Sequence, residues 1–164
     1  MKLESLRDLY LEQLKDLYSA ENQLVDALPK MADAASAPEL KNAFREHLNQ
    51  TRQHVERLEK IFQTLNQSPK GETCEGMKGL VKEGEEMMKM KGEPEVIDAG
   101  LIAAAQRVEH YEIAGYGTVR TYAELLGEPE AVRILERTLK EEGEADRLLT
   151  QIAVRKLHPA VLGH

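Results

Sequence analysis

The chain has 164 residues, of which 41% are hydrophobic, 31% are charged and only 4% are aromatic. This length fits one domain with a sizeable core, and good helix formers are plentiful while long Val-, Ile- and Thr-rich runs are missing. The formal net charge of −7 and the pI near 5.3, without a basic stripe, exclude a typical nucleic-acid-binding protein.

Cysteine content and the N-terminal sequence bear on the compartment. Cys74 is the one cysteine, so no disulfide can form within the chain, which is typical of a reducing environment. The N-terminal stretch is charged and amphipathic rather than continuously apolar, so it reads as neither a signal peptide nor a membrane span. We therefore expect a cytoplasmic protein without a membrane partner. Cys74 itself is expected to be a bystander in a loop, with an exposed thiol sensor as the alternative.

Four long segments show helical periodicity, with apolar residues recurring every three or four positions. The first covers about 2–35, and Pro29 is expected to bend it or to shorten its last turns. The second covers about 38–66. The third and fourth cover about 94–126 and 129–157, and a turn rich in glycine and proline separates them.

The connection 67–93 differs from these four segments because it is rich in glycine and methionine. It is predicted to carry one short helix, over about 75–89. Short turns within each pair of long helices and a long connection between the pairs describe a four-helix bundle with one crossover, which is the ferritin-like connectivity. The sequence therefore predicts one all-α, ferritin-like domain over 1–164.

Several polar residues occupy positions where the periodicity predicts apolar side chains. On a helix, positions i, i+3, i+4 and i+7 share a face, so each long segment presents at least one such residue inward. Pairing within each hairpin is expected to bring the first two segments' residues together, and likewise those of the last two. The inward residues are Glu21 on the first segment, His47, Gln50 and His54 on the second, Glu109 and Glu112 on the third, and Glu142 and Asp146 on the fourth.

Convergence of these acids in one core predicts a metal site. A buried carboxylate is costly unless it is paired or coordinates a metal, and like charges would raise one another's pKa until some protonated. Two divalent cations remove this conflict. Oxygen ligands with a minority of imidazoles suit iron or manganese, and carboxylates can bridge the two ions.

Each residue also has an ordinary interpretation. A single Glu on a helix is usually solvated, and we assign Glu136, Glu141 and Glu144 to the solvated face. Tyr116 lies two turns from Glu109 and could reach a metal-bound oxygen, although packing with a hydroxyl bonded to a carbonyl is commoner for a buried tyrosine. The coincidence of inward polar residues on all four long segments is what favours the metal site.

Three stretches carry a resemblance to a known family: DLYSAE at 16–21, EHL at 46–48 and VEHYEIAGYGT at 108–118. They resemble the YciF-like bacterial stress proteins, and the run 139–146 also fits the family's fourth helix. The resemblance covers almost the whole chain. It implies a ferritin-like fold, a homodimer, an architecture related to rubrerythrin and other di-iron carboxylate proteins, and induction by general and osmotic stress, without an established activity.

Carried over residue by residue, the resemblance implies metal ligands at Glu21, His47, His54, Glu109, Glu112, Glu142 and Asp146. One position departs from the family, whose second helix usually reads His-Leu-x-Glu-Thr where this chain has HLNQT at 47–51. Gln50 is a poorer bridging ligand than glutamate, although it can offer a carbonyl oxygen or hydrogen-bond a ligand. We therefore expect weaker occupancy of one of two iron positions, or a single ion.

The sequence leaves two functions open, and with them the question of whether the protein is an enzyme. The first is a redox protein in which O2 or peroxide reacts at a di-iron centre. It would need an external reductant, since the chain has no rubredoxin-type cysteine pair. The second is a non-enzymatic structural or stress dimer in which metal only stabilises the fold. Iron storage is disfavoured because it needs a hollow shell of many subunits.

Overall fold

The computed structural model describes residues 2–157, and within them the chain forms five α-helices and no strand. The all-α class is thus confirmed. The single domain expected over 1–164 extends past the described residues at both ends. The helices are α1 (Leu6–Ala34), α2 (Pro38–Thr64), α3 (Glu75–Lys89), α4 (Pro94–Leu125) and α5 (Pro129–Ile152), and a π-helical turn (Ala153–Leu157) follows α5.

The helix ends agree with the sequence expectation to within a few residues, and α3 has the predicted bounds. α1 begins later than predicted because Ser5 caps it, with the Ser5 hydroxyl accepting a hydrogen bond from the Asp8 amide at 3.1 Å. Pro29 lies inside α1 but does not end it, since the helix continues to Ala34. The last predicted turns of α5 are replaced by the π-helical turn.

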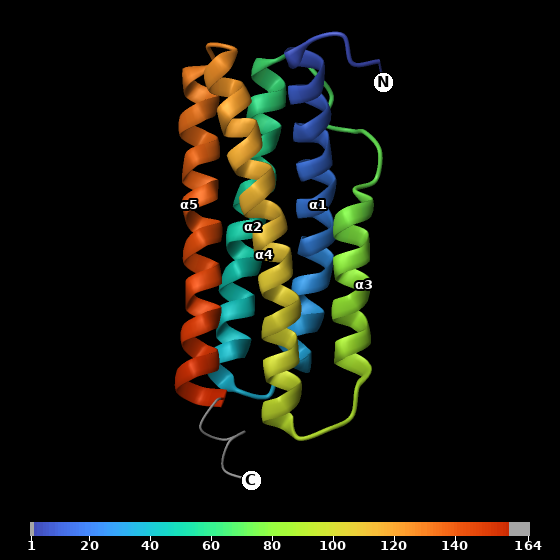
Figure 1. The fold of residues 1–164 in the computed structure, drawn as a ribbon, viewed down its shortest axis with the longest axis vertical. Helices are drawn as coiled ribbons and strands as arrows, with labels where there is room; N and C mark the ends of the chain where they lie inside the picture. Colours follow the sequence, from blue (N-terminus) through green and yellow to red (C-terminus); the bar gives the residue numbers. More distant parts are fainter. Residues whose placement is uncertain (1, 158–164) are drawn as a thin grey trace.

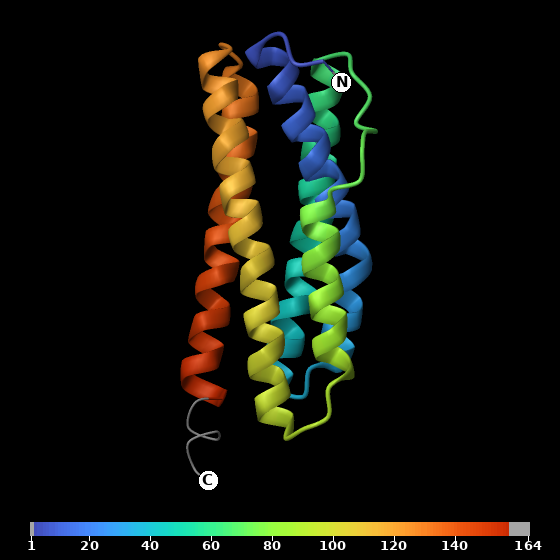
Figure 2. The same ribbon diagram turned by 45° about the vertical axis from the view of Figure 1, so that its right-hand side comes forward.

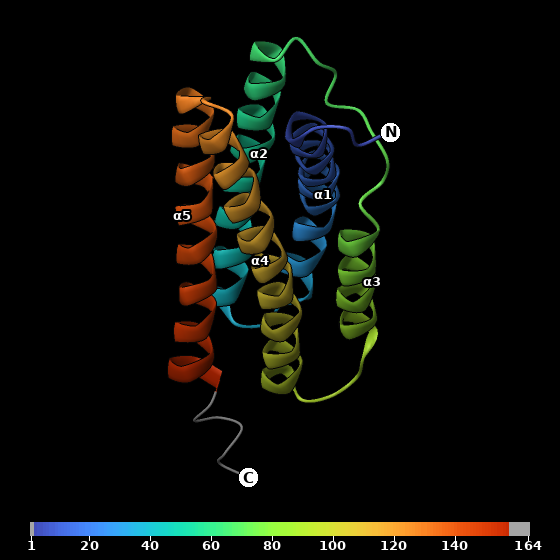
Figure 3. The same cartoon turned by 45° about the horizontal axis from the view of Figure 1, so that its top comes forward.

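The four long helices lie side by side along the long axis of the molecule, and α3 packs beside α1 and α4 (Figures 1 and 2). The connection from α2 returns along the length of the bundle through α3, so α4 runs in the same direction as α2 (Figure 3). α2 and α4 also end alike, with Asn66 and Gly127 in left-handed conformations at φ of 52° and 71°. None of the helices in the described part is long and apolar enough to cross a bilayer.

The core consists of two apolar clusters at different heights in the bundle. One joins the first half of α1 to the later halves of α2 and α4, through residues such as Tyr10, Phe62 and Val119. The other joins the second half of α1 to the earlier halves of α2 and α4, through residues such as Leu28 and Phe44. Along the long helices, buried polar side chains lie between the residues of one apolar cluster and those of the other, and together they form a polar layer.

Cys74 is buried, with 1% of its surface exposed, so an exposed thiol sensor is the wrong interpretation. It caps α3, where its sulfur accepts a hydrogen bond from the Met77 amide at 3.4 Å. The sulfur also lies 2.9 Å from the Tyr111 hydroxyl, which donates to Asp16 at 2.6 Å. Burial raises the pKa of the Cys74 thiol. The cysteine therefore anchors the crossover to the bundle.

Candidate metal centre

The buried polar layer draws one or more side chains from each long helix. Helical spacing explains the alignment, because His47, Thr51 and His54 of α2 share one face and so do Glu109 and Glu112 of α4. All of these residues are at most 6% exposed. The members of the layer are Glu21, His47, Thr51, His54, Glu109, Glu112, Thr138 and Glu142.

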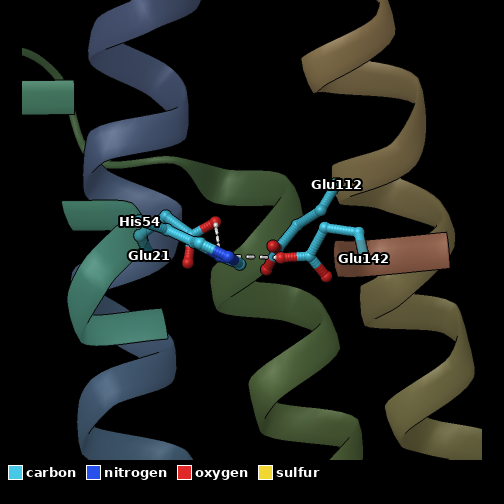
Figure 4. A group of neighbouring side chains, drawn as sticks. All are labelled: Glu21, His54, Glu112 and Glu142. Carbon is cyan, nitrogen blue, oxygen red and sulfur yellow. Dashed lines mark ion pairs between the residues drawn. The ribbon is translucent and has the colours of Figure 1, made fainter. Parts of the chain in front are cut away.

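Four of these side chains point toward one another and form what we call the inner group: Glu21, His54, Glu112 and Glu142 (Figure 4). One ligand atom from each lies within 4.8 Å of the others, and all four residues are 0% exposed. Nδ1 of His54 is 3.0 Å from Oε1 of Glu142 and 3.7 Å from Oε1 of Glu21. This spacing suits a single cation between three carboxylates and one imidazole.

A second set, the outer group, consists of His47, Glu109 and Glu142, again with ligand atoms within 4.8 Å of one another. Nε2 of His47 lies 3.0 Å from Oε1 of Glu109 and 3.9 Å from Oε2 of Glu142. Glu142 belongs to both groups. Its Oε1 faces His54 and its Oε2 faces His47, which is the arrangement of a carboxylate that can bridge two ions.

His54 is held from behind by a pair of residues that lie outside both groups. Its Nε2 is 3.2 Å from Oε1 of Glu141. The guanidinium group of Arg57 donates hydrogen bonds to both oxygens of Glu141, at 2.8 and 3.1 Å. The assignment of Glu141 to the solvated face was therefore wrong. Arg57 follows His54 by one helical turn, and Glu141 adjoins the inward Glu142. The sequence did offer a signal: a positive charge, Arg57, lies one turn from an inward residue of the second segment, and a negative charge, Glu141, lies next to an inward residue of the fourth.

Tyr116 is buried and donates a hydrogen bond from its hydroxyl to Oε1 of Glu21 at 2.9 Å. The partner is thus a carboxylate of the inner group, rather than the backbone carbonyl that is commoner for a buried tyrosine. Its ring also lies edge-on to His54, with centroids 6.2 Å apart. Tyr116 therefore fixes the position of Glu21 and covers one side of the inner group.

The carboxyl groups of the centre are poorly suited to carrying charge without a cation. Burial raises the pKa of Glu112 well above its ordinary value and also raises that of Glu142. Burial, with the charge of Glu21, raises the pKa of Glu109 to about 7, although contact with Glu142 opposes the shift.

Two side chains, His54 of the inner group and Glu141 behind it, are charged as long as no cation is bound, and His54 must release its Nδ1 proton before it can coordinate one. Burial alone would lower the pKa of His54, but the surrounding carboxylates outweigh burial and raise that pKa to about 11. Burial likewise opposes charge on Glu141, yet His54 and Arg57 hold the pKa of Glu141 at about 2. The fixed charges of Glu141 and Arg57 therefore orient His54 without needing a cation.

Unpartnered polar atoms test whether the residues fit a metal. Within the described part of the chain, eleven buried side-chain nitrogen or oxygen atoms lack a hydrogen-bond partner. All but the Tyr10 hydroxyl belong to the two groups or to Asp146, and they include both oxygens of Glu112 and of Glu142. Buried polar atoms are ordinarily satisfied. This donor set of oxygen and imidazole nitrogen therefore fits divalent cations such as iron or manganese.

Two predicted site residues lie outside both groups. Asp146 has one oxygen 3.2 Å from Nε2 of His110, while its other oxygen is buried and has no hydrogen-bond partner among the described residues. Gln50 is half-buried and lines a cavity beside His47 and Glu109, away from Glu21.

The expected pairing within hairpins is correct for Glu21 with His54 and for Glu109 with Glu142. Both groups nevertheless mix residues from the two hairpins, because side chains that point to the centre of the bundle also meet those of the opposite pair.

The chain matches one protein family and several proteins of known sequence or structure. The domain of unknown function DUF892 matches residues 5–161. The protein YciF of Escherichia coli (strain K12) is 42% identical over 159 residues, which is 96% of each chain. The crystal structure of the E. coli stress protein YciF matches with a TM-score of 0.90 at 43% identity, covering 93% of this chain and 96% of that one. YcfI of Rhodopseudomonas palustris, for which a structural role has been suggested, matches with a TM-score of 0.88 at 41% identity, covering 91% and 95%.

Proposed function

The chain belongs to the DUF892 family, with the stress protein YciF among its relatives, and from this premise we propose that it is a stress-response protein whose ferritin-like four-helix bundle holds a pair of metal ions. Iron is the expected metal, and manganese offers the alternative with the same ligand preferences. The observation that carries the proposal is the sharing of Glu142 by two buried groups of ligands.

Each residue of the centre has a defined task in this proposal. The inner group would hold one ion and the outer group the other, with Glu142 between them. Arg57 and Glu141 orient the His54 ring, and Tyr116 positions Glu21. Gln50, which lines a cavity with His47 and Glu109, and Asp146 would be supplementary or weak ligands. The apolar clusters on either side of the layer keep water from the fully buried inner group.

A di-iron pair bound in such a centre supplies reactivity toward O2 or peroxide. The chain's own contribution is to gather the carboxylates in a buried layer, where a cation would keep them ionised against their raised pKa values, to keep His54 in one orientation, and to shield the inner group. The buried Tyr116 hydroxyl, hydrogen-bonded to Glu21, keeps a proton at a fixed atom beside the inner group, because burial raises its pKa well above the ordinary value. We propose oxidase or peroxidase chemistry as the first candidate activity, with electrons from an external reductant.

The second candidate is a structural protein in which metal only stabilises the fold. It is favoured by the unpartnered carboxylates, since ions that satisfy them would contribute directly to folding free energy. The structural role suggested for YcfI of R. palustris points the same way. In either case we propose a cytoplasmic homodimer, as the family resemblance implies, and size-exclusion chromatography with light scattering tests the dimer.

Elemental analysis combined with anomalous scattering from crystals of the purified protein tests the metal centre. We expect iron, with one scatterer in the inner group and a second of equal or lower occupancy in the outer group. Absence of metal after loading with Fe(II) or Mn(II) would contradict the proposal. Peroxide turnover by iron-loaded protein, lost in Glu109→Ala but kept in the exposed variant Glu83→Gln, favours the redox function. A metal-dependent rise in melting temperature without turnover favours the structural one.

A further inference from the structure

A cavity of about 160 Å³ lies in the bundle next to the outer group. Its walls come from all four long helices and are mainly apolar, with Leu28, Phe44, Val108 and Leu149 among the buried side chains that line it. Such a space in a close-packed interior is uncommon, because cores ordinarily leave few voids larger than a water molecule. The helices therefore preserve this volume instead of closing it.

The dimensions and lining of the cavity define what it can hold. An apolar cavity of roughly 150 Å³ lined by Leu, Ile and Phe stays dry and binds benzene or xenon. The cavity here has similar volume and similar walls over most of its surface. A ligand of that size would gain contacts with the side chains that now face empty space.

One end of the cavity is polar and belongs to the metal centre. His47 and Glu109 line it, and both are members of the outer group, whereas none of Glu21, His54 or Glu112 does. Among the described residues, Nδ1 of His47 has no partner, and its Nε2 lies within ion-pair distance of the carboxylates of Glu109 and Glu142. A molecule in the cavity would therefore lie against the outer ligands and be separated from the sealed inner ones.

The other end reaches the surface between α2 and α5. Glu46 and Glu144 are exposed at this mouth, Gln50 is half-buried, and Leu148 is 37% exposed. The two carboxylates repel anions, and the apolar walls make desolvation of any charged group costly. The neutral amide of Gln50 and the apolar Leu148 leave a path for uncharged molecules.

We propose that this cavity is a binding site for a small, uncharged, apolar molecule of about benzene size, which enters between α2 and α5 and lies beside the outer metal position. The site deepens the proposed function by giving it a substrate class, and only its last step, proximity to metal, rests on that function. The cavity itself is formed by the chain alone, so ligand binding can be measured with and without metal.

Xenon and benzene are the probes, and a pair of matched variants on α4 provides the control. Ala105 lines the cavity and Ala103, on the same helix, is exposed, so Ala105→Leu fills the space while Ala103→Leu leaves it open. We expect a xenon peak in the cavity of pressurised crystals, and a rise in melting temperature with benzene. Ala105→Leu should weaken benzene binding by at least about tenfold, with Ala103→Leu unchanged. If Ala105→Leu does not fold, Ala43→Leu replaces it.

Proximity to metal is read from the relaxation of benzene protons by NMR. Protein loaded with Mn(II) should broaden the benzene signal far more than protein loaded with Zn(II), and Ala105→Leu should abolish the difference. Absence of xenon and benzene from the cavity, or benzene binding retained in the filled variant, would overturn the inference even if metal binds. Occupancy of the cavity in a protein that binds no metal would support the cavity and contradict the proposed function.

Discussion

The inner and outer groups use the same residue types but have different surroundings. The inner group is fully enclosed, and its histidine is fixed by Glu141 and Arg57. The outer group is enclosed almost as well, yet within the described chain His47 has no partner at Nδ1 to fix its ring, and it lines a cavity. Hydrogen bonds that orient the ligands, together with surroundings that exclude water, favour tight metal binding. A cavity next to the ligands allows a second molecule to approach them. If both groups bind metal as proposed, the contrast predicts tighter binding of the ion at the inner group and easier approach of a second molecule to the outer group.

The largest effect is expected from Glu142→Gln, because both groups share this carboxylate. Loss of metal affinity should exceed the roughly 10–100-fold that is typical of residues that merely support a ligand, and both ions should be lost together. Elemental analysis and calorimetry measure both effects. Loss of only one ion would show that the two groups do not share Glu142.

A smaller and one-sided effect is expected from Glu141→Gln. Its carboxylate contacts His54 and no member of the outer group, so affinity at the inner position should fall by about 10–100-fold while the outer position is unchanged. Glu136→Gln on the same helix is the matched control, because Glu136 is exposed and its ion pair within the described chain is with Arg120. Site-resolved occupancy from anomalous scattering would separate the two positions. An equal loss of metal affinity at both positions would show that Glu141 does not act on the inner group alone.

The pH dependence of the metal-free protein reports on the buried titratable groups of both sets. The pKa of His54, raised to about 11, makes stability fall with rising pH above pH 6.5, in the same direction as the acids discussed next. The pKa of Glu109 is raised to about 7 in the folded protein, so folded protein binds more protons than unfolded protein between pH 4.5 and 7. Stability should therefore fall as pH rises through this window, and the raised pKa values of Glu112 and Glu142 act in the same direction. Melting temperatures at pH 5 and pH 8 test the slope. Glu109→Gln should flatten it, and a slope of opposite sign would contradict the buried, unpaired state of these acids.

The smallest effect is expected from Gln50→Glu. Gln50 lines the cavity beside His47 and Glu109, so a carboxylate there should raise occupancy of the outer position and leave the inner one unchanged. Metal counts on the variant and on the parent protein measure the change. Equal stoichiometry and equal affinity in the two proteins would show that the neutral amide does not weaken the site.

Periodicity was sufficient to predict the helices and the inward residues, because the face of a helix follows from spacing alone. It placed Glu21, His54 and Glu109 in the core and gave the bounds of α3 correctly. It could not tell which residues would meet across the bundle, since that depends on the relative height of helices joined by a long crossover. Glu141 was misassigned for a related reason. A side chain at the edge of the buried stripe can either face solvent or form an ion pair with a residue of another helix. Glu141 forms such a pair, with Arg57.

The polar layer between two apolar clusters also fixes how the helices align along their length. Sliding any long helix by one turn would carry a carboxylate or imidazole into an apolar cluster and bring a Leu or Phe into the layer. Leaving a buried charge unpaired in this way is strongly destabilising. Apolar packing alone tolerates neighbouring alignments of two helices far better. The layer therefore specifies one relative position of the helices along the bundle axis. A cation bound in the layer would further stabilise that arrangement during folding.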